Sequence, residues 1–209
     1  MPNTHVDYLR KIREEYNFVP QVVYDIGACV LHWTDAAQTV WPEPEYIAFE
    51  AMSATEFLYK ERDMRYNIGC LTNEDNKELE FYENVENPGG NSYYRENSEL
   101  SSGADILYTE AHRRVCRGMT LDTVVREKQF PPADFIKMDV QGAELDVLLG
   151  AGIALQSAKH VILELQQVEY NKGAPLRDTI IQYMDQLGFE CKGIFCDNGP
   201  DGDYHFVRR

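Results

Sequence analysis

The chain has 209 residues, and 20 Lys+Arg against 35 Asp+Glu give it a formal net charge of −15. This length indicates one domain, residues 1–209, whose core needs no disulfide or metal to stabilise it. Proteins that grip nucleic acid or anionic membranes carry an excess of Lys and Arg, so the acidic balance excludes nucleic acid as a partner. The N-terminus lacks a signal-peptide profile and no apolar run is long enough to span a membrane, so we expect no membrane insertion.

Five cysteines lie scattered along the chain, without a C-x-x-C pair and without a cluster of histidines beside them. An odd number of isolated cysteines is typical of reduced thiols. The sequence therefore predicts a cytoplasmic protein without a zinc site.

Short apolar runs alternate with helical patterns through the first half of the chain. A leading segment, residues 1–20, carries an amphipathic pattern, and turn signals end the apolar runs that follow. The elements expected here are a helix over 5–16, a strand over 22–27, a helix over 34–41, a strand over 46–50, a helix opened by a capping box over 53–62, and strands over 66–70 and 79–82.

Residues 84–112 are polar and have Pro-Gly-Gly at 88–90. A loop this long inside a compact domain is usually functional or mobile. We therefore expect an irregular excursion on the substrate side.

The second half of the chain shows the clearest alternation of strands and helices. The expected elements are a strand over 134–139, a helix over 143–149, a strand over 160–165, a helix over 176–187, and strands over 189–195 and 204–207. Such alternation predicts a parallel sheet covered on both faces. A short Gly/Pro turn joins the last two strands, which must therefore be antiparallel. The fold class is α/β, a doubly wound and mostly parallel sheet with an antiparallel C-terminal hairpin at one edge.

Four acids stand at the ends of predicted parallel strands: Asp25, Glu50, Asp139 and Glu164. Ligands of such sheets bind beyond the carboxyl ends of the strands, where the strand order reverses. Glu50 ends the second strand, where a carboxylate can accept hydrogen bonds from both hydroxyls of a ribose. Gly27 would let the backbone approach a ligand closely.

The turn after the first strand argues against a dinucleotide. Residues 27–32 contain one glycine, whereas a pyrophosphate cradle needs G-x-G-x-x-G, and Asp25 would repel a pyrophosphate. A nicotinamide-dependent oxidoreductase is therefore the less favoured alternative. The four carboxylates better suit a nucleoside that carries a sulfonium and an ammonium group, such as S-adenosylmethionine.

Several motifs resemble those of the FkbM-type S-adenosylmethionine-dependent methyltransferases, from about Val22 to the C-terminus. The motifs are Asp25-Ile26-Gly27-Ala28, Phe49-Glu50, Leu121-Asp122, the run from Phe135 to Glu144, and Leu148-Leu149-Gly150-Ala151. The resemblance implies a Rossmann-like class I methyltransferase with a seven-stranded sheet. It also implies O-methylation of a sugar hydroxyl, for example on a deoxyhexose such as rhamnose within a glycan. The expected cofactor contacts are Asp25, Gly27, Ala28, Glu50, Ala51, Cys70, Leu71 and Asp139.

Two turns depart from the family pattern. Cys29 and Leu31 stand where the family has Asn and Gly, and Leu31 is expected to put a side chain where the backbone passes close to the cofactor. Gln141 stands in place of a Glu and removes one charge from the turn after the strand over 134–139. These departures keep open a second alternative, a non-catalytic binding module on the same fold.

A sugar hydroxyl is a poor nucleophile at neutral pH, so a general base should help methyl transfer. Asp139 is the first candidate for the catalytic base, and Lys137 and Glu164 are weaker ones; Lys137 is also expected to pair with an acid. Alternatively, Asp139 and Glu164 bind a divalent metal, Mg²⁺ or Mn²⁺, that acidifies neighbouring hydroxyls. The sequence leaves both solutions open.

The acceptor site is expected in the excursion, at the run Asn91, Ser92, Tyr93, Tyr94 and Arg95. Aromatic faces stack on sugar rings, and Asn and Arg hydrogen-bond hydroxyl groups. A neutral sugar or glycan would also not be repelled by an acidic protein.

Overall fold

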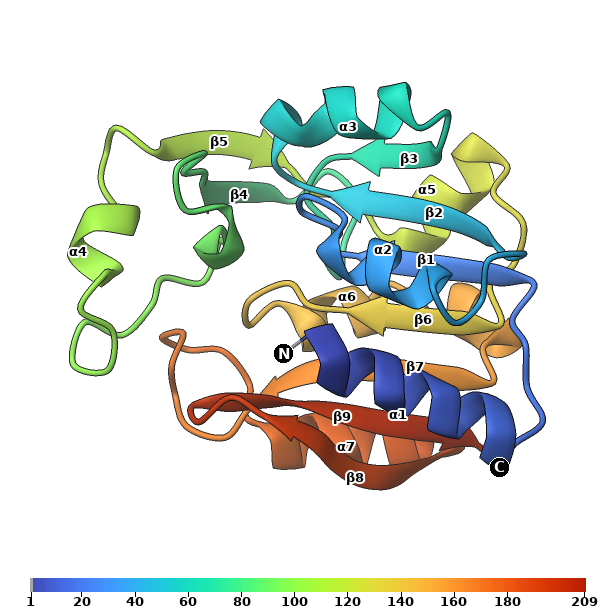
Figure 1. Ribbon diagram of the computed structural model, residues 1–209. Helices are drawn as coiled ribbons and strands as arrows, with labels where there is room; N and C mark the ends of the chain where they lie inside the picture. The colour runs from blue at the N-terminus through green and yellow to red at the C-terminus, as the bar shows by residue number, and fades with distance from the viewer. Residues whose placement is uncertain (1) are drawn as a thin grey trace.

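The computed structural model describes residues 2–209 and has a seven-stranded sheet at its centre (Figure 1). Its strand order is β3-β2-β1-β6-β7-β9-β8, with β9 antiparallel to both of its neighbours and the other pairings parallel. The strands are β1 (Val22–Ile26), β2 (Glu45–Glu50), β3 (Arg65–Ile68), β6 (Phe135–Met138), β7 (His160–Gln166), β8 (Phe189–Asp197) and β9 (Asp201–Arg208). The predicted α/β fold with an antiparallel hairpin at one edge is confirmed. The strand order reverses between β1 and β6.

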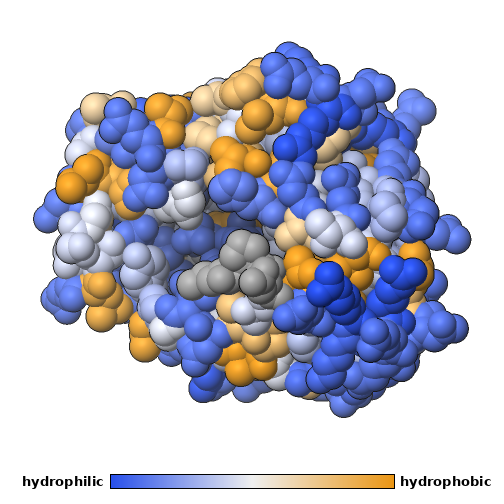
Figure 2. Space-filling view, viewed as in Figure 1, coloured by the Kyte–Doolittle hydropathy of each residue, from blue (hydrophilic) through white to orange (hydrophobic). Residues whose placement is uncertain are grey.

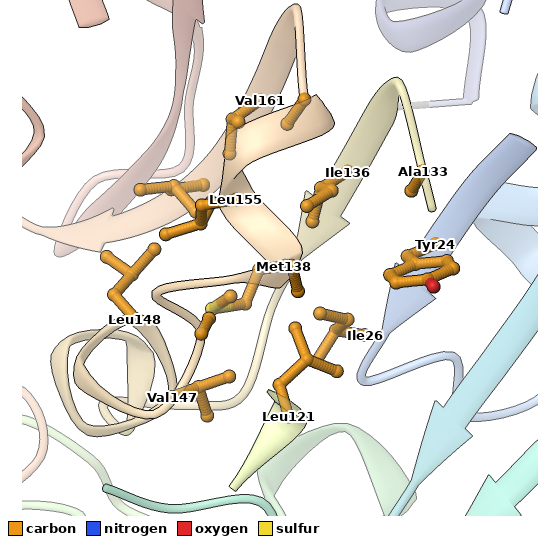
Figure 3. Close-up of a cluster of buried hydrophobic side chains, with 14 of the residues drawn as sticks. Tyr24, Ile26, Leu121, Ala133, Ile136, Met138, Val147, Leu148, Leu155 and Val161 are labelled. Carbon is orange, nitrogen blue, oxygen red and sulfur yellow. The ribbon is translucent and has the colours of Figure 1, made fainter. Parts of the chain in front are cut away.

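Helices cover both faces of this sheet. On one face lie α1 (Pro2–Glu15), α2 (His32–Gln38) and α3 (Glu56–Glu61), and on the other α5 (Leu121–Lys128), α6 (Glu144–Leu149) and α7 (Arg177–Gln186). Successive side chains of a strand point to opposite faces, so Phe135 packs with α1 and α2 while Ile136 packs with α5 and α6. Figure 3 shows the second of these clusters. Burial on both faces explains why β1 and β6 read as nearly continuous apolar runs.

The excursion stands beyond the carboxyl ends of β1, β2 and β6, at the left of Figure 1. It is flanked by a separate antiparallel ribbon of β4 (Glu78–Tyr82) and β5 (Arg113–Arg117). Between these strands the chain forms a 3-10 turn, η2 (Pro88–Gly90), and one short helix, α4 (Ala104–Leu107), and is otherwise irregular.

Two elements, β5 and α5, were not expected from the sequence. The side chains of β5 are exposed or half-buried on both faces, so no apolar alternation marks this strand. Thr120 caps α5, because its side chain accepts a hydrogen bond from the backbone N–H of Thr123.

The expected capping box at Ser53 does not form. Residues Ser53–Thr55 make a 3-10 turn, η1, without a side-chain cap, and α3 begins only at Glu56. The Thr55 hydroxyl donates to the backbone oxygen of Met52 instead. A further 3-10 turn, η3 (Ala154–Ser157), precedes β7.

The face of the molecule seen in Figure 2 is predominantly hydrophilic, with scattered hydrophobic residues. Within residues 2–209, no helix is both long enough and apolar enough to cross a membrane.

Candidate functional site

The turn after β1 packs directly against the end of β6. Gly27 has φ +80°, and a Cβ at this position would lie 1.7 Å from the carbonyl oxygen of Asp139. The neighbouring backbone therefore requires a glycine here, in addition to any approach of a ligand. The Gly27 N–H donates to the carbonyl oxygen of Phe49 at 2.9 Å, which ties the turn to β2.

The expectation for Leu31 is wrong. Its backbone adopts the left-handed conformation, with φ +68°, but its side chain is fully buried among Ala28, Ala48 and Tyr59. It points into the core and does not line a cavity at the turn. Leu31, which stands where the family has glycine, therefore does not block the space beside the turn. It no longer supports the alternative of a non-catalytic binding module.

A cavity, here called the cofactor cavity, lies between the carboxyl ends of β1, β2 and β6 and the excursion. Six of the eight expected cofactor contacts line it: Gly27, Glu50, Ala51, Cys70, Leu71 and Asp139. Further wall residues that were not among the expected cofactor contacts include Ile26, Phe49, Gly69, Phe81, Val140 and Ala143. The cavity encloses about 100 Å³. Small-molecule sites usually measure about 300–1,000 Å³, so this cavity is small for a nucleoside. Residues of the segment 88–93 form part of its wall.

Asp25 and Ala28 do not line the cofactor cavity, contrary to expectation. The Asp25 carboxylate is buried under the turn, where the Thr34 hydroxyl donates to it at 2.6 Å. Burial raises the pKa of Asp25 to about 6. Ala28 is packed in the core beside Leu31. Both residues hold the turn in place and do not touch a ligand in this cavity.

Glu50 is the acid best placed for a nucleoside. Its two carboxylate oxygens accept hydrogen bonds from the backbone N–H groups of Met52 and Cys29, each at 2.8 Å. Burial raises its pKa, and these two hydrogen bonds oppose that rise. Each oxygen keeps a lone pair for a ribose hydroxyl, and the apolar side chains of Ile26 and Leu71 offer a surface for a base. The residues present therefore fit S-adenosylmethionine.

Asp139 belongs to a hydrogen-bonded network at the end of β6. Lys137 Nζ donates to Asp139 at 2.9 Å, and Gln141 Nε2 donates to Asp139 at 2.9 Å and to Glu164 at 2.8 Å. Burial would raise the pKa of Asp139, but the Lys137 ammonium and these hydrogen bonds hold it at about 2. Burial and the Asp139 charge raise the pKa of Glu164 well above its usual range.

This network weakens all three candidates for the general base. Asp139 binds protons too weakly, because a base works best with a pKa near the operating pH. The raised pKa of Glu164 favours its protonated form, which cannot accept a proton. The neighbouring acids outweigh burial and raise the pKa of Lys137, so its ammonium has no free lone pair.

The network also does not fit the alternative of a divalent metal at Asp139 and Glu164. The Lys137 ammonium and the Gln141 amide already donate to oxygens of these two carboxylates and would compete with an ion for them. An ion placed there would also be repelled by the lysine charge.

The run expected to grip the acceptor is instead engaged within the protein. Asn91, Ser92 and Tyr93 line the cofactor cavity, and the Ser92 hydroxyl donates to the carbonyl oxygen of Gln141 at 2.8 Å. The Tyr94 hydroxyl donates to Asp146 at 3.1 Å, which ties the excursion to α6.

Arg95 also has partners within the excursion. It donates to the carbonyl oxygen of Tyr108 at 2.6 Å and stacks over the ring of Tyr82. The run therefore braces the excursion against the sheet.

A second cavity, of about 340 Å³, opens on the face of the sheet that α1 and α2 cover. Its lining residues are His5, His32, Trp33, Ala36, Lys137, Asp139, Glu164, Asn198 and Asp203. Asp139 lines both cavities. The sequence singled out Lys137, Asp139 and Glu164 in this wall. It missed the other lining residues, because they come from distant segments without a shared motif.

Comparisons with known proteins agree with this geometry. A family model, the methyltransferase FkbM domain, matches residues 25–191. A stretch of 87 residues is 38% identical to the AMB antimetabolite synthetase AmbE of Pseudomonas aeruginosa; it spans 41% of this chain and 4% of that protein's length.

Two solved structures are similar to the whole fold. Precorrin-6y C5,15-methyltransferase of Geobacter metallireducens has a TM-score of 0.51 at 10% identity, over 98% of this chain and 87% of that one. Magnesium protoporphyrin IX methyltransferase of Synechocystis, solved with bound SAM, has a TM-score of 0.51 at 11% identity, over 100% and 79% of the chains. At such low identity these likenesses concern the fold alone.

Proposed function

Because this chain belongs to the FkbM family of S-adenosylmethionine-dependent methyltransferases, we propose that it methylates a hydroxyl oxygen of a sugar. A deoxyhexose such as rhamnose within a glycan is the proposed acceptor.

The cofactor cavity supplies the groups that this activity needs. Glu50 would accept the ribose hydroxyls, and the apolar walls beside it would hold the adenine ring. When bound, the cofactor supplies a methyl group on a positively charged sulfur. The acidic edge of the sheet favours such a charge, since Glu50 and Asp139 both face the cavity.

The proposal that the methyl group goes to an oxygen atom rests on the hydrogen-bonded network around Asp139. A sugar hydroxyl both donates and accepts hydrogen bonds, and the end of β6 presents donors in Lys137 and Gln141 and an acceptor in Asp139. Holding the acceptor oxygen in line with the methyl group is the main requirement of the transfer. We assign Asp139 to orientation, because its low pKa makes it a weak base.

A methyl-transfer screen tests the proposal. The purified chain is incubated with isotopically labelled S-adenosylmethionine and a panel of neutral glycosides, amines and carboxylic acids, and products are identified by mass spectrometry. We expect label on a hydroxyl oxygen of a glycoside. Label only on nitrogen, carbon or a carboxylate would rule out the sugar acceptor, and failure to bind S-adenosylhomocysteine in calorimetry would contradict the use of the cofactor.

A further inference from the structure

We propose that the second cavity is the acceptor pocket, where Trp33 carries the sugar ring and His5, held by Asp203, takes up the proton of the reacting hydroxyl. This inference rests on the proposed function and adds to it the place and the recognition of the acceptor.

The position of the second cavity is the first argument. Asp139 is part of its wall and of the wall of the cofactor cavity, so a ligand in each cavity would meet at this residue. The volume of about 340 Å³ is sufficient for a ring of monosaccharide size. The run 91–95 offers no comparable space, because its side chains are bonded to the protein itself.

Trp33 is the second argument. One face of its indole stacks near Phe135, with ring centroids 6.0 Å apart and an interplanar angle of 21°. Its Nε1–H is buried and has no partner among the residues described. A buried donor without a partner costs about 1–3 kcal/mol, which a hydroxyl of the ligand would relieve. Indole rings also provide an apolar surface for the C–H face of a sugar.

His5 is the third argument. Its Nε2 lies 3.1 Å from a carboxylate oxygen of Asp203, which is itself buried in β9. Its Nδ1 is buried and has no partner within residues 2–209. With the proton of the neutral ring on Nε2, toward the carboxylate, Nδ1 keeps its lone pair and can accept a proton. A carboxylate beside a histidine orients the ring and stabilises its charged form.

Other charged or titratable groups around His5 do not supply a better base. Those in the walls of the cavity are Asp203, Lys137, Asp139, Glu164 and His32, and the Cys196 sulfur lies within 4.8 Å of both the His5 ring and the Asp203 carboxylate. The pKa of Asp139 is held low by Lys137, and burial and the Asp139 charge raise the pKa of Glu164, as described above. As the sugar oxygen bonds to the methyl carbon, the carbon–sulfur bond pair stays on sulfur and the hydroxyl proton passes to His5 Nδ1.

Two measurements without turnover test the pocket. Calorimetry reports S-adenosylhomocysteine binding, and saturation-transfer NMR of the loaded protein reports binding of the methyl glycosides of rhamnose, fucose, glucose and galactose. We expect Trp33→Ala to leave the nucleoside affinity within about twofold and to weaken glycoside binding by roughly tenfold or more. Trp33→Phe should lose less, because it keeps the ring. The matched control is Phe57→Ala, which removes an exposed aromatic side chain on α3.

The results separate the inference from the function on which it rests. If the unchanged protein does not bind S-adenosylhomocysteine, the proposed function fails. If glycosides bind but Trp33→Ala binds them as well as Phe57→Ala, the acceptor pocket is wrong and the function stands. If the nucleoside binds but no glycoside does, both the sugar acceptor and the pocket are wrong.

Kinetics with the glycoside that takes up methyl test His5. We expect His5→Gln to lower kcat by roughly 10²–10⁴-fold and to leave KM within a few-fold. His112→Gln, in the excursion, is the control. Full kcat in His5→Gln would overturn its role as the base.

Discussion

Lys137 Nζ lies 2.9 Å from Asp139 Oδ2 at the carboxyl end of β6. Both side chains point to the face of the sheet covered by α1 and α2, whereas Ile136 and Met138 point to the opposite core. The lysine is 4% exposed, so its ammonium depends on this carboxylate for a partner. This pair therefore places a carboxylate and an ammonium group where the two cavities adjoin, since Asp139 lines both.

Removing the lysine charge should therefore destabilise the fold in a pH-dependent way. The pKa of Asp139 is about 2 in the folded state against an ordinary value near 4, so the stability it contributes is present above about pH 4 and is lost as the pH falls towards 2. We expect Lys137→Met to cost about 1–3 kcal/mol at pH 7, because it leaves a half-buried carboxylate without its charged partner, and less below pH 4.

Calorimetric melting between pH 7 and pH 3 measures this effect. The control is Lys192→Met, whose partner Glu190 is exposed and whose loss should cost less than about 1 kcal/mol. Equal losses in the two variants, or a loss in Lys137→Met that does not change with pH, would contradict the assignment.

Gly27 and Gly188 form a matched pair for the packing of the first turn. Their φ angles are +80° and +84°, so alanine strains both backbones by about 1–2 kcal/mol. Only at Gly27 would the new Cβ overlap a neighbouring carbonyl, whereas nothing lies within 4 Å at Gly188. We expect Gly27→Ala to be less stable than Gly188→Ala by a further 1–3 kcal/mol or more, in urea unfolding monitored by circular dichroism. Similar stabilities would mean that the turn does not pack against Asp139.

Glu50→Gln should weaken the binding of S-adenosylhomocysteine without unfolding the protein. The glutamine amide has the size of the glutamate side chain. In the unchanged protein the backbone N–H groups of Cys29 and Met52 donate to the two carboxylate oxygens, and in the variant one of them would face an NH₂ group. Loss of charged hydrogen bonds of this kind costs about 1.5–3 kcal/mol, or roughly ten- to a hundredfold in Kd by calorimetry. The exposed Glu61→Gln is the control, and equal affinities in the two variants would show that Glu50 does not contact the nucleoside.

Cys70 and Cys116 should form a disulfide under mild oxidation. Their sulfur atoms lie 3.0 Å apart, and the hydrogen bond from Cys70, together with Arg114, lowers the pKa of Cys116 to about 7. The Cys116 thiolate can attack oxidised glutathione and release one glutathione, after which Cys70 displaces the second. Peptide mapping should find the internal bridge in the unchanged chain and only a glutathione adduct at Cys116 in Cys70→Ser. Adducts on both cysteines of the unchanged chain, without a bridge, would show that the two sulfurs are not in contact.

The alternation of apolar runs with helical patterns could be predicted from the sequence, because it follows from the local periodicity of buried strands and amphipathic helices. The same reasoning placed Glu50 and Asp139 at one edge, since parallel strands end together. It failed where no apolar pattern exists, as in β5, and where a loop residue turns inward, as Leu31 does.

By itself, then, the sequence determined the order of strands and helices, the α/β class with its edge hairpin, and the acids at the carboxyl ends of the strands, all of which depend on residues close in the chain. Only the tertiary structure decided that Asp25 lies under the turn, that Lys137 holds the Asp139 pKa low, and that His5 and Trp33 share a cavity with Asp203. These features depend on burial and on contacts between distant segments, and such contacts exist only once the sheet and its two layers of helices have formed.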